Sequence, residues 1–209
     1  DAMSVGEITL LMKAGFPVER IFFVPNNVAP CELAFALENG VMTSLDSLSQ
    51  LELFGEVCNQ MEIAPENRKC AVRINPGVGA GHHEKVVTGG KKTKFGIAEY
   101  SIPQIFEIAE KYQITIAGIN QHIGSLFMDP QPYLDAVTNL LRIAHQFKNL
   151  EFIDFGGGYG IPYHKLDDEK DFPMEDFKSR LEPILDEFVA SYGKAPLFKS
   201  EPGRYCVAE

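Results

Sequence analysis

Short apolar segments alternate with longer segments of helical spacing along the chain. The short segments are rich in β-branched and aromatic residues, as strands are. They lie at Ile21–Val24, Val41–Ser44, Cys70–Asn75, Thr115–Gln121, Glu151–Phe155 and Pro196–Ser200. The longer segments repeat apolar residues every three or four positions, which is typical of helices that cover a core. They lie at Val5–Ala14, Pro30–Asn39, Ser47–Met61, Ile102–Tyr112, Pro132–Phe147 and Met174–Tyr192. Alternating strands and helices predict parallel β/α units.

Residues at the ends of the predicted helices support these boundaries. A glycine follows three of the helices, where a left-handed C-terminal cap is expected: Gly15, Gly40 and Gly193. Ser47 and Gln50 have the spacing of a capping box, in which side chains bond to the free amides at a helix start. Pro30 suits a first helical turn, because its missing N–H has no partner there in any case.

Two architectures fit this alternation, a doubly wound open sheet and a (β/α)₈ barrel. Polar residues close nearly every predicted strand, namely Asn26-Asn27, Asp46, Arg73, Asn75, Gln121-His122, Asp154 and Glu201. A barrel gathers all such ends at one mouth, whereas an open sheet concentrates function at one switch point. We therefore expect an α/β fold of the parallel (β/α)₈, TIM-barrel type.

A complete barrel has eight strands, and six are predicted here. The chain also begins and ends without polar tails. We therefore expect residues 1–209 to form one partial barrel domain, a fragment of a larger protein.

Charge and composition narrow the functional classes. The net charge of −10 would repel phosphates, so the sequence argues against broad binding to nucleic acid or to an anionic membrane. No segment approaches the roughly 20 apolar residues of a membrane span, and the N-terminus lacks the pattern of a signal peptide. The four cysteines show no Cys-x-x-Cys spacing and lie in apolar stretches, so they are interpreted as core residues of a cytoplasmic protein.

The first candidate motif is the glycine-rich segment Asp154-Phe155-Gly156-Gly157-Gly158-Tyr159-Gly160, directly after a predicted strand. Successive glycines allow close backbone approach, so that several amides can point at one anion. The motif differs from the dinucleotide-binding fingerprint, because Ile161 stands where the last glycine would be, and no Gly-Lys-Ser/Thr follows. The alternative interpretation is a plain tight turn.

The second candidate motif is Gln121-His122-Ile123-Gly124-Ser125, at the end of a predicted strand. An imidazole at a barrel mouth can stack on a flat ring or transfer a proton, and the serine hydroxyl can donate to a phosphate. The alternative is a core histidine followed by a turn serine.

The third candidate motif is Ser200-Glu201-Pro202-Gly203-Arg204-Tyr205, after the last predicted strand. A strand-end carboxylate can hold a proton on a ring nitrogen, and arginine pairs with phosphate or carboxylate in a fork geometry. The alternative is a surface turn with an ordinary Glu/Arg pair.

A fourth segment runs from Arg73 to Ile97 and is long, polar and rich in glycine. Loops of this length are usually functional or disordered. Its adjacent His82 and His83 lack the spacing of metal ligands on a helix, and no neighbouring Cys or Asp completes a zinc set. No metal site is expected.

Together the motifs supply donors for a phosphate, an imidazole for an aromatic ring and a carboxylate for a ring nitrogen, which are the requirements of pyridoxal phosphate. The order His-Ile-Gly-Ser, Asp-Phe-Gly-Gly-Gly, Glu-Pro-Gly-Arg-Tyr resembles the barrel-fold, alanine-racemase-like decarboxylases that act on ornithine, arginine and diaminopimelate. This resemblance runs from Asp1 to Glu209. The segment Arg73–Ile97 and the pair Asn26-Asn27 resemble the diaminopimelate branch of that family.

The resemblance implies roles for individual residues. His122 would stack on the cofactor ring, Glu201 would keep the pyridine nitrogen protonated, and these two are the implied catalytic residues. Arg73 would lie near the ring hydroxyl, and Asp1 near the catalytic lysine. Arg204 would also meet the substrate. The implied cofactor-binding residues are Asp1, Arg73, His122, Ser125, Gly157, Gly158, Glu201, Pro202, Gly203 and Arg204.

Two features of the resembled family are missing from this sequence. The family's cofactor-binding lysine lies on barrel strand one in an Ala-Val-Lys-Ala-Asn type of motif, which does not occur here. The C-terminal β-domain is also missing. The chain as given is therefore expected to lack activity.

The resemblance implies that the parent protein is a homodimeric, pyridoxal-phosphate-dependent enzyme that converts meso-diaminopimelate to L-lysine and CO₂. The alternatives are a decarboxylase of arginine, ornithine or carboxynorspermidine, a homologue that has lost activity and acts as a regulator, and another phosphate-binding barrel.

Overall fold

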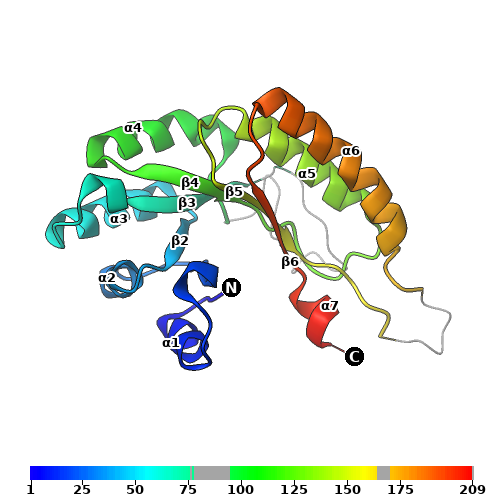
Figure 1. Cartoon of the computed structure of the whole chain (residues 1–209), viewed down its shortest axis with the longest axis horizontal. Coiled ribbons are helices and arrows are strands. Elements are labelled where there is room, and N and C mark those ends of the chain that lie inside the picture. The colour runs from blue at the N-terminus through cyan, green and yellow to red at the C-terminus, as the bar shows by residue number, and fades with distance from the viewer. Residues whose placement is uncertain (76, 78–94, 164–169, 209) are drawn as a thin grey trace. The chain divides into compact units, whose positions relative to one another are not determined.

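The computed structural model describes residues 1–75, 77, 95–163 and 170–208 (Figure 1). These residues form two compact units. The first comprises Asp1–Ile74 and Phe95–Asn120, and the second comprises the described residues of Asn75–Lys94 and Gln121–Glu209. Each unit is built from parallel strands with helices between them.

The first unit contains four parallel strands that pair in chain order. Its elements are α1 (Val5–Lys13), β1 (Phe22–Phe23), α2 (Pro30–Glu38), β2 (Met42–Leu45), α3 (Leu48–Gln60), β3 (Lys69–Arg73), α4 (Ile102–Tyr112) and β4 (Thr115–Asn120). Short 3₁₀ turns lie at Val18–Arg20, Pro65–Asn67 and Glu99–Ser101. Ala2 also pairs in parallel with Phe23, which adds the N-terminal residues to the edge of the sheet.

The second unit contains α5 (Gln131–Ala144), β5 (Phe152–Gly157), α6 (Met174–Tyr192), β6 (Leu197–Glu201) and α7 (Gly203–Val207). Strands β5 and β6 pair in parallel, and α5 and α6 lie side by side along them (Figure 1). The segment after β4 joins this unit through a parallel bridge between Phe127 and Tyr159.

Strand order distinguishes the two architectures that fit the sequence. In both units each strand pairs with the next strand in the chain, whereas a doubly wound sheet reverses its order at a switch point. The structure therefore confirms the predicted α/β fold as part of a parallel barrel. None of the described helices has the length and apolar character that crossing a membrane would need.

The predicted capping residues are confirmed at the helix ends that carry them. Gly15, Gly40 and Gly193 have φ of +87°, +68° and +75°, as left-handed caps require. The Ser47 hydroxyl accepts from the Gln50 amide at 3.3 Å. The returning bond of the capping box is displaced by one residue, because Gln50 Oε1 accepts from the Asp46 amide.

Several expectations differ from the structure. The helix predicted over Pro132–Phe147 is α5, Gln131–Ala144, and the strand predicted over Cys70–Asn75 is β3, Lys69–Arg73. Strand β5 continues through Gly157, two residues beyond its predicted end at Phe155, because Gly157 pairs with Glu201 of β6. Helix α7 was not predicted, since five residues are too few to show a helical period. The interpretation of all four cysteines as core residues is wrong for Cys31 and Cys206, which are exposed. Cys31 lies in the first turn of α2 and Cys206 in α7, and an apolar stretch of sequence does not reveal which side of a helix faces solvent.

Thiol accessibility tests this arrangement of cysteines. Burial raises the pKa of Cys58 to about 11 and raises that of Cys70 further, and the thiolate is the reactive form. At pH 8 we expect iodoacetamide to label Cys31 and Cys206 in the folded protein, and Cys58 and Cys70 only after denaturation. Peptide mass spectrometry identifies each labelled site. Rapid labelling of Cys70 in the native protein would contradict the fold.

Candidate functional site

A β-bulge ends strand β5 at the candidate site. Asp154 pairs with Lys199, and Gly157 pairs with Glu201. Between these pairs lie two residues of β5, Phe155 and Gly156, and a single residue of β6, so one strand carries an extra residue. Gly156 accommodates it with φ of +74°. Bulges bend a strand and change the direction in which the following residues point, and here those residues are the glycines of the first motif.

The glycines of this motif are required by close backbone contacts. A Cβ atom on Gly157 would overlap the backbone carbonyl oxygen of Glu201. A Cβ atom on Gly158, whose φ is +109°, would overlap the carbonyl oxygen of Gly124. Gly158 also accepts a hydrogen bond from the amide of Phe127 at 3.2 Å. Gly157 therefore lies against the third motif and Gly158 against the second, so the three motifs meet in one place.

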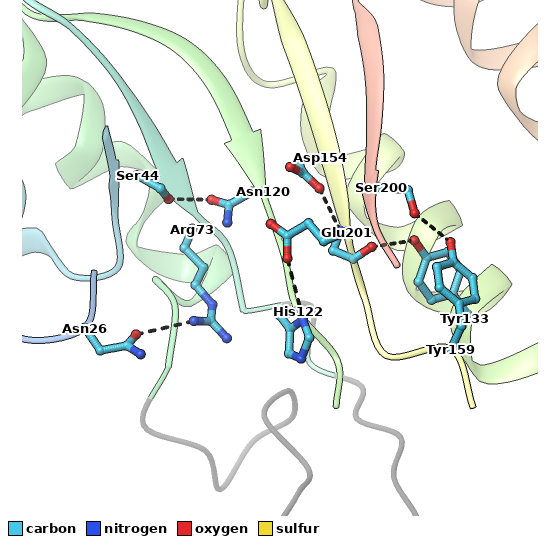
Figure 2. A network of polar contacts seen from close by, with 11 residues as sticks. Asn26, Ser44, Arg73, Asn120, His122, Tyr133, Asp154, Tyr159, Ser200 and Glu201 are labelled. Carbon is cyan, nitrogen blue, oxygen red and sulfur yellow. Dashed lines mark hydrogen bonds and ion pairs between the residues drawn. The ribbon is translucent and has the colours of Figure 1, made fainter. Parts of the chain in front are cut away.

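His122 and Glu201 form a pair at this meeting point. Nδ1 of His122 lies 4.0 Å from Oε2 of Glu201, and the side chains are 31% and 21% exposed (Figure 2). Both groups are thus within reach of a bound molecule while being largely shielded from water. Shielding strengthens the attraction between the carboxylate and any cation placed beside it.

Arg204 and Ser125 form the second polar contact of the site. One guanidinium nitrogen donates to Ser125 Oγ at 3.3 Å, and the other terminal nitrogen donates to the hydroxyl of Tyr163. Among the residues that the structure describes, Nε of Arg204 is buried and lacks a hydrogen-bond partner. A buried guanidinium donor without a partner costs free energy, which is the property expected of a group that binds an anion.

Buried hydrogen bonds hold the backbone of Gly156 and join Tyr159 to Ser200. Asp154 is buried, and its carboxylate accepts from the Gly156 amide at 2.9 Å. The hydroxyl of Tyr133 in α5 donates to the Gly156 carbonyl oxygen at 3.0 Å. The hydroxyls of Tyr159 and Ser200 lie 3.0 Å apart (Figure 2). Burial raises the pKa of Asp154, although the Gly156 hydrogen bond and the nearby Lys199 oppose this shift.

Sequence reasoning did not single out Tyr133, and it gave no role to Tyr159, which lies within the first motif. Both are buried in an aromatic cluster in which ring centroids lie 5.0 to 6.0 Å apart. The cluster consists of Phe127, Tyr133, Tyr159, Phe172 and Phe177. Tyr133 stands at a helical position that any core aromatic could fill, so only its hydroxyl distinguishes it.

The predicted site residues divide between the two units. The second unit brings together His122, Ser125, Gly157, Gly158, Glu201 and Arg204. Pro202 and Gly203 begin the short helix that carries Arg204, and a Cβ atom on Gly203 would meet no other atom. The glycines and histidines of residues 78–94, including His82 and His83, lie outside the described residues.

Asp1 and Arg73 belong to the first unit, where their surroundings differ. Asp1 is exposed. Arg73 is 6% exposed, and one guanidinium nitrogen lies 3.4 Å from Oδ1 of Asn26. Its guanidinium also lies 5.1 Å from the ring centre of Phe95. Burial raises the pKa of Asp46, while the positive charge of Arg73 opposes that shift. The roles implied for Asp1 and Arg73 stay predictions.

Comparison with known proteins identifies relatives over the whole chain. Residues 1–208 match the family model described as pyridoxal-dependent decarboxylase, pyridoxal binding domain. The chain is 41% identical to the diaminopimelate decarboxylase of Methanothermobacter thermautotrophicus, in an alignment that covers 100% of this chain and 48% of that protein. It is 32% identical to the diaminopimelate decarboxylase of Archaeoglobus fulgidus, over 99% of this chain and 49% of the relative.

A solved structure gives the same result. The crystal structure of diaminopimelate decarboxylase from Helicobacter pylori complexed with L-lysine is similar to this chain with a TM-score of 0.88 and 28% identity. The similarity covers 100% of this chain and 52% of that one. The chain thus spans about half the length of the relatives it matches.

The close backbone contacts of the site predict which glycines tolerate a side chain. Gly157→Ala should lower the free energy of unfolding by about 1–3 kcal/mol, because its methyl group would meet backbone rather than a movable side chain. Gly203→Ala is the matched control, since its methyl group would enter open space, and its stability should stay within about 0.5 kcal/mol of wild type. Urea unfolding measures both. Equal losses in the two variants would contradict the described packing.

Proposed function

Because the chain belongs to the pyridoxal-dependent decarboxylase family, we propose that the protein containing it decarboxylates meso-diaminopimelate to L-lysine with bound pyridoxal 5′-phosphate. One observation carries the proposal: the glycines that end β5 approach the backbones of His122, Glu201 and Gly124, and the same segments carry the His122–Glu201 pair and the Arg204–Ser125 contact. The first pair suits a phosphate, and the second suits a heteroaromatic ring. The substrate follows from the relatives, which are named diaminopimelate decarboxylases at up to 41% identity.

The residues present fit this cofactor. Nε of Arg204, which has no hydrogen-bond partner within the described part of the chain, supplies a buried donor for an anion. A charge-assisted bond to phosphate is stronger than one between neutral groups. Gly157 and Gly158 leave no room for a Cβ, because the backbone of Glu201 and of Gly124 lies where it would be, so only main-chain groups can border the site there. The carboxylate of Glu201 offers an acceptor to a protonated ring nitrogen.

The chain's own residues would divide the work of the reaction. When bound, the cofactor accepts the electron pair that remains on the substrate Cα after CO₂ leaves. Arg204 and Ser125 would bind the phosphate and fix the position of the ring. Glu201 would hold a proton on the ring nitrogen, because a carboxylate beside a nitrogen base favours its charged form. His122 would border the ring and limit its motion.

The proposed enzyme is a cytoplasmic homodimer. The homodimer is implied by the family resemblance, and the cytoplasmic location was inferred from the spacing of the cysteines. Light scattering on the full-length protein tests the dimer.

The role of Glu201 has a direct test in the full-length protein. Glu201→Ala should lower kcat by about 100-fold or more, the typical cost of removing a group that stabilises developing charge. The dissociation constant of pyridoxal phosphate should change much less, since the phosphate contacts remain. Glu182→Gln is the control, because Glu182 pairs with Lys178 on an exposed helix face and should keep wild-type turnover. Wild-type kcat in Glu201→Ala would refute the proton-holding role.

Substrate identity has a separate test. The full-length protein is incubated with meso-diaminopimelate, ornithine, arginine and carboxynorspermidine in turn, and the amine products and CO₂ are measured. We expect L-lysine from meso-diaminopimelate, with kcat/KM at least about 100-fold above that for the other substrates. Preference for another substrate would reassign the protein within the family, and turnover of none would favour the regulatory homologue.

A further inference from the structure

Both polar groups of the Gly156 backbone are held by side chains. Its N–H donates to the carboxylate of Asp154 at 2.9 Å, and its carbonyl oxygen accepts from the hydroxyl of Tyr133 at 3.0 Å (Figure 2). Gly156 is the residue with positive φ in the bulge of β5. The two side chains therefore fix the peptide groups from which the chain turns toward Gly157 and Gly158.

The hydroxyl of Tyr133 serves no evident purpose in packing. The ring is fully buried and lies 5.3 Å from the ring centre of Phe127, 5.0 Å from that of Tyr159 and 5.4 Å from that of Phe177. A phenylalanine would make the same ring contacts. A buried hydroxyl costs free energy unless it is hydrogen-bonded. The hydroxyl of Tyr133 also interacts with those of Tyr159 and Ser200, and its bond to Gly156 is the one that reaches the backbone of the bulge.

We propose that Tyr133 is a positioning residue for the phosphate-binding part of the site. Its bond to Gly156 holds the bulge in the conformation that places Gly157 against Glu201 and Gly158 against Gly124. This inference rests on the proposed function in one respect, the identification of the anion as the phosphate of pyridoxal phosphate. Burial raises the pKa of Tyr133 well above its ordinary value, so the phenol remains a proton donor throughout the working pH range.

Tyr192 of α6 provides a matched control, because it bonds to the backbone just before the start of β5. The hydroxyl of Tyr192 donates to the carbonyl oxygen of Phe147 at 2.9 Å and accepts from the amide of Leu150 at 3.1 Å, just before β5 begins. Tyr192 thus makes the same kind of bond between a phenol and a backbone carbonyl, away from the bulge. A purely structural role for Tyr133 would give the two tyrosines similar effects.

The experiment compares Tyr133→Phe, Tyr192→Phe and wild type in the full-length protein. The dissociation constants of pyridoxal phosphate and of pyridoxal, which lacks the phosphate, are measured by absorbance titration. We expect Tyr133→Phe to weaken pyridoxal phosphate binding roughly 3- to 10-fold, the worth of one hydrogen bond, and to leave pyridoxal binding unchanged. Tyr192→Phe should leave both constants within about twofold of wild type. Saturating pyridoxal phosphate should restore kcat in Tyr133→Phe.

A second measurement does not depend on activity. Hydrogen exchange followed by mass spectrometry should show faster exchange across residues 156–158 in Tyr133→Phe and not in Tyr192→Phe. The reason is that Tyr133→Phe removes one of the two side-chain hydrogen bonds to the Gly156 backbone. Unchanged exchange and an unchanged dissociation constant in Tyr133→Phe would overturn the positioning role. Equal weakening of pyridoxal and pyridoxal phosphate would also overturn it, since the effect would then not concern the phosphate.

Failure of the proposed function would look different. If wild-type protein bound inorganic phosphate but not pyridoxal phosphate, the cofactor assignment would be wrong. The same three proteins titrated with inorganic phosphate would then decide the role of Tyr133, with the same 3- to 10-fold difference expected.

Discussion

The site depends on a lack of space around the backbone at the end of β5. Main-chain atoms of Glu201 and Gly124 approach Gly157 and Gly158 so closely that no Cβ fits at either position. This constraint explains why three motifs that are far apart in the sequence act as one site. Gly158 lies against Gly124, the residue before Ser125, and Gly157 lies against Glu201, three residues before Arg204. The side chains of Ser125 and Arg204 are in contact. The glycines thus determine the geometry of the site before any ligand is considered.

The sequence predicts the elements well because the barrel pattern is local. Buried parallel strands appear in the sequence as short apolar segments, and the helices that cover them appear as longer segments with apolar residues every three or four positions. The helices Ile102–Tyr112 and Met174–Tyr192 lie where they were predicted. The end of β5 was missed, because a strand that closes in glycines lacks the β-branched residues by which strands are recognised. The exposure of Cys31 and Cys206 was missed for a different reason, since burial of a residue near a helix end depends on tertiary contacts that no local pattern reports.

The sequence indicated the polar residues that meet at the bulge of β5, but it did not indicate the residues that hold the bulge in place. His122, Ser125, Glu201 and Arg204 are recognisable because each is a chemical group at a strand end, and a family resemblance assigns them roles. The sequence analysis explained the glycines by amides that face an anion. The structure gives a second explanation for glycine at these positions, because there is no room for a side chain. Tyr133 carries no such signal. It occupies an apolar helical position, and its partner Gly156 is 23 residues away in the sequence, so only the folded chain reveals the bond.

Buried polar groups at the strand ends of the first unit follow the same energetic logic. The hydroxyl of Ser44 donates to Asn120 at 2.6 Å, and both side chains are almost fully buried. Arg73 has Asn26, the ring of Phe95 and the charge of Asp46 to offset the loss of water. Such arrangements are seldom more stabilising than apolar side chains of the same volume, because desolvation consumes most of the attraction between the charges. Stability alone therefore gives little reason to place a guanidinium at the end of β3, and the cofactor-binding role predicted for Arg73 would supply one.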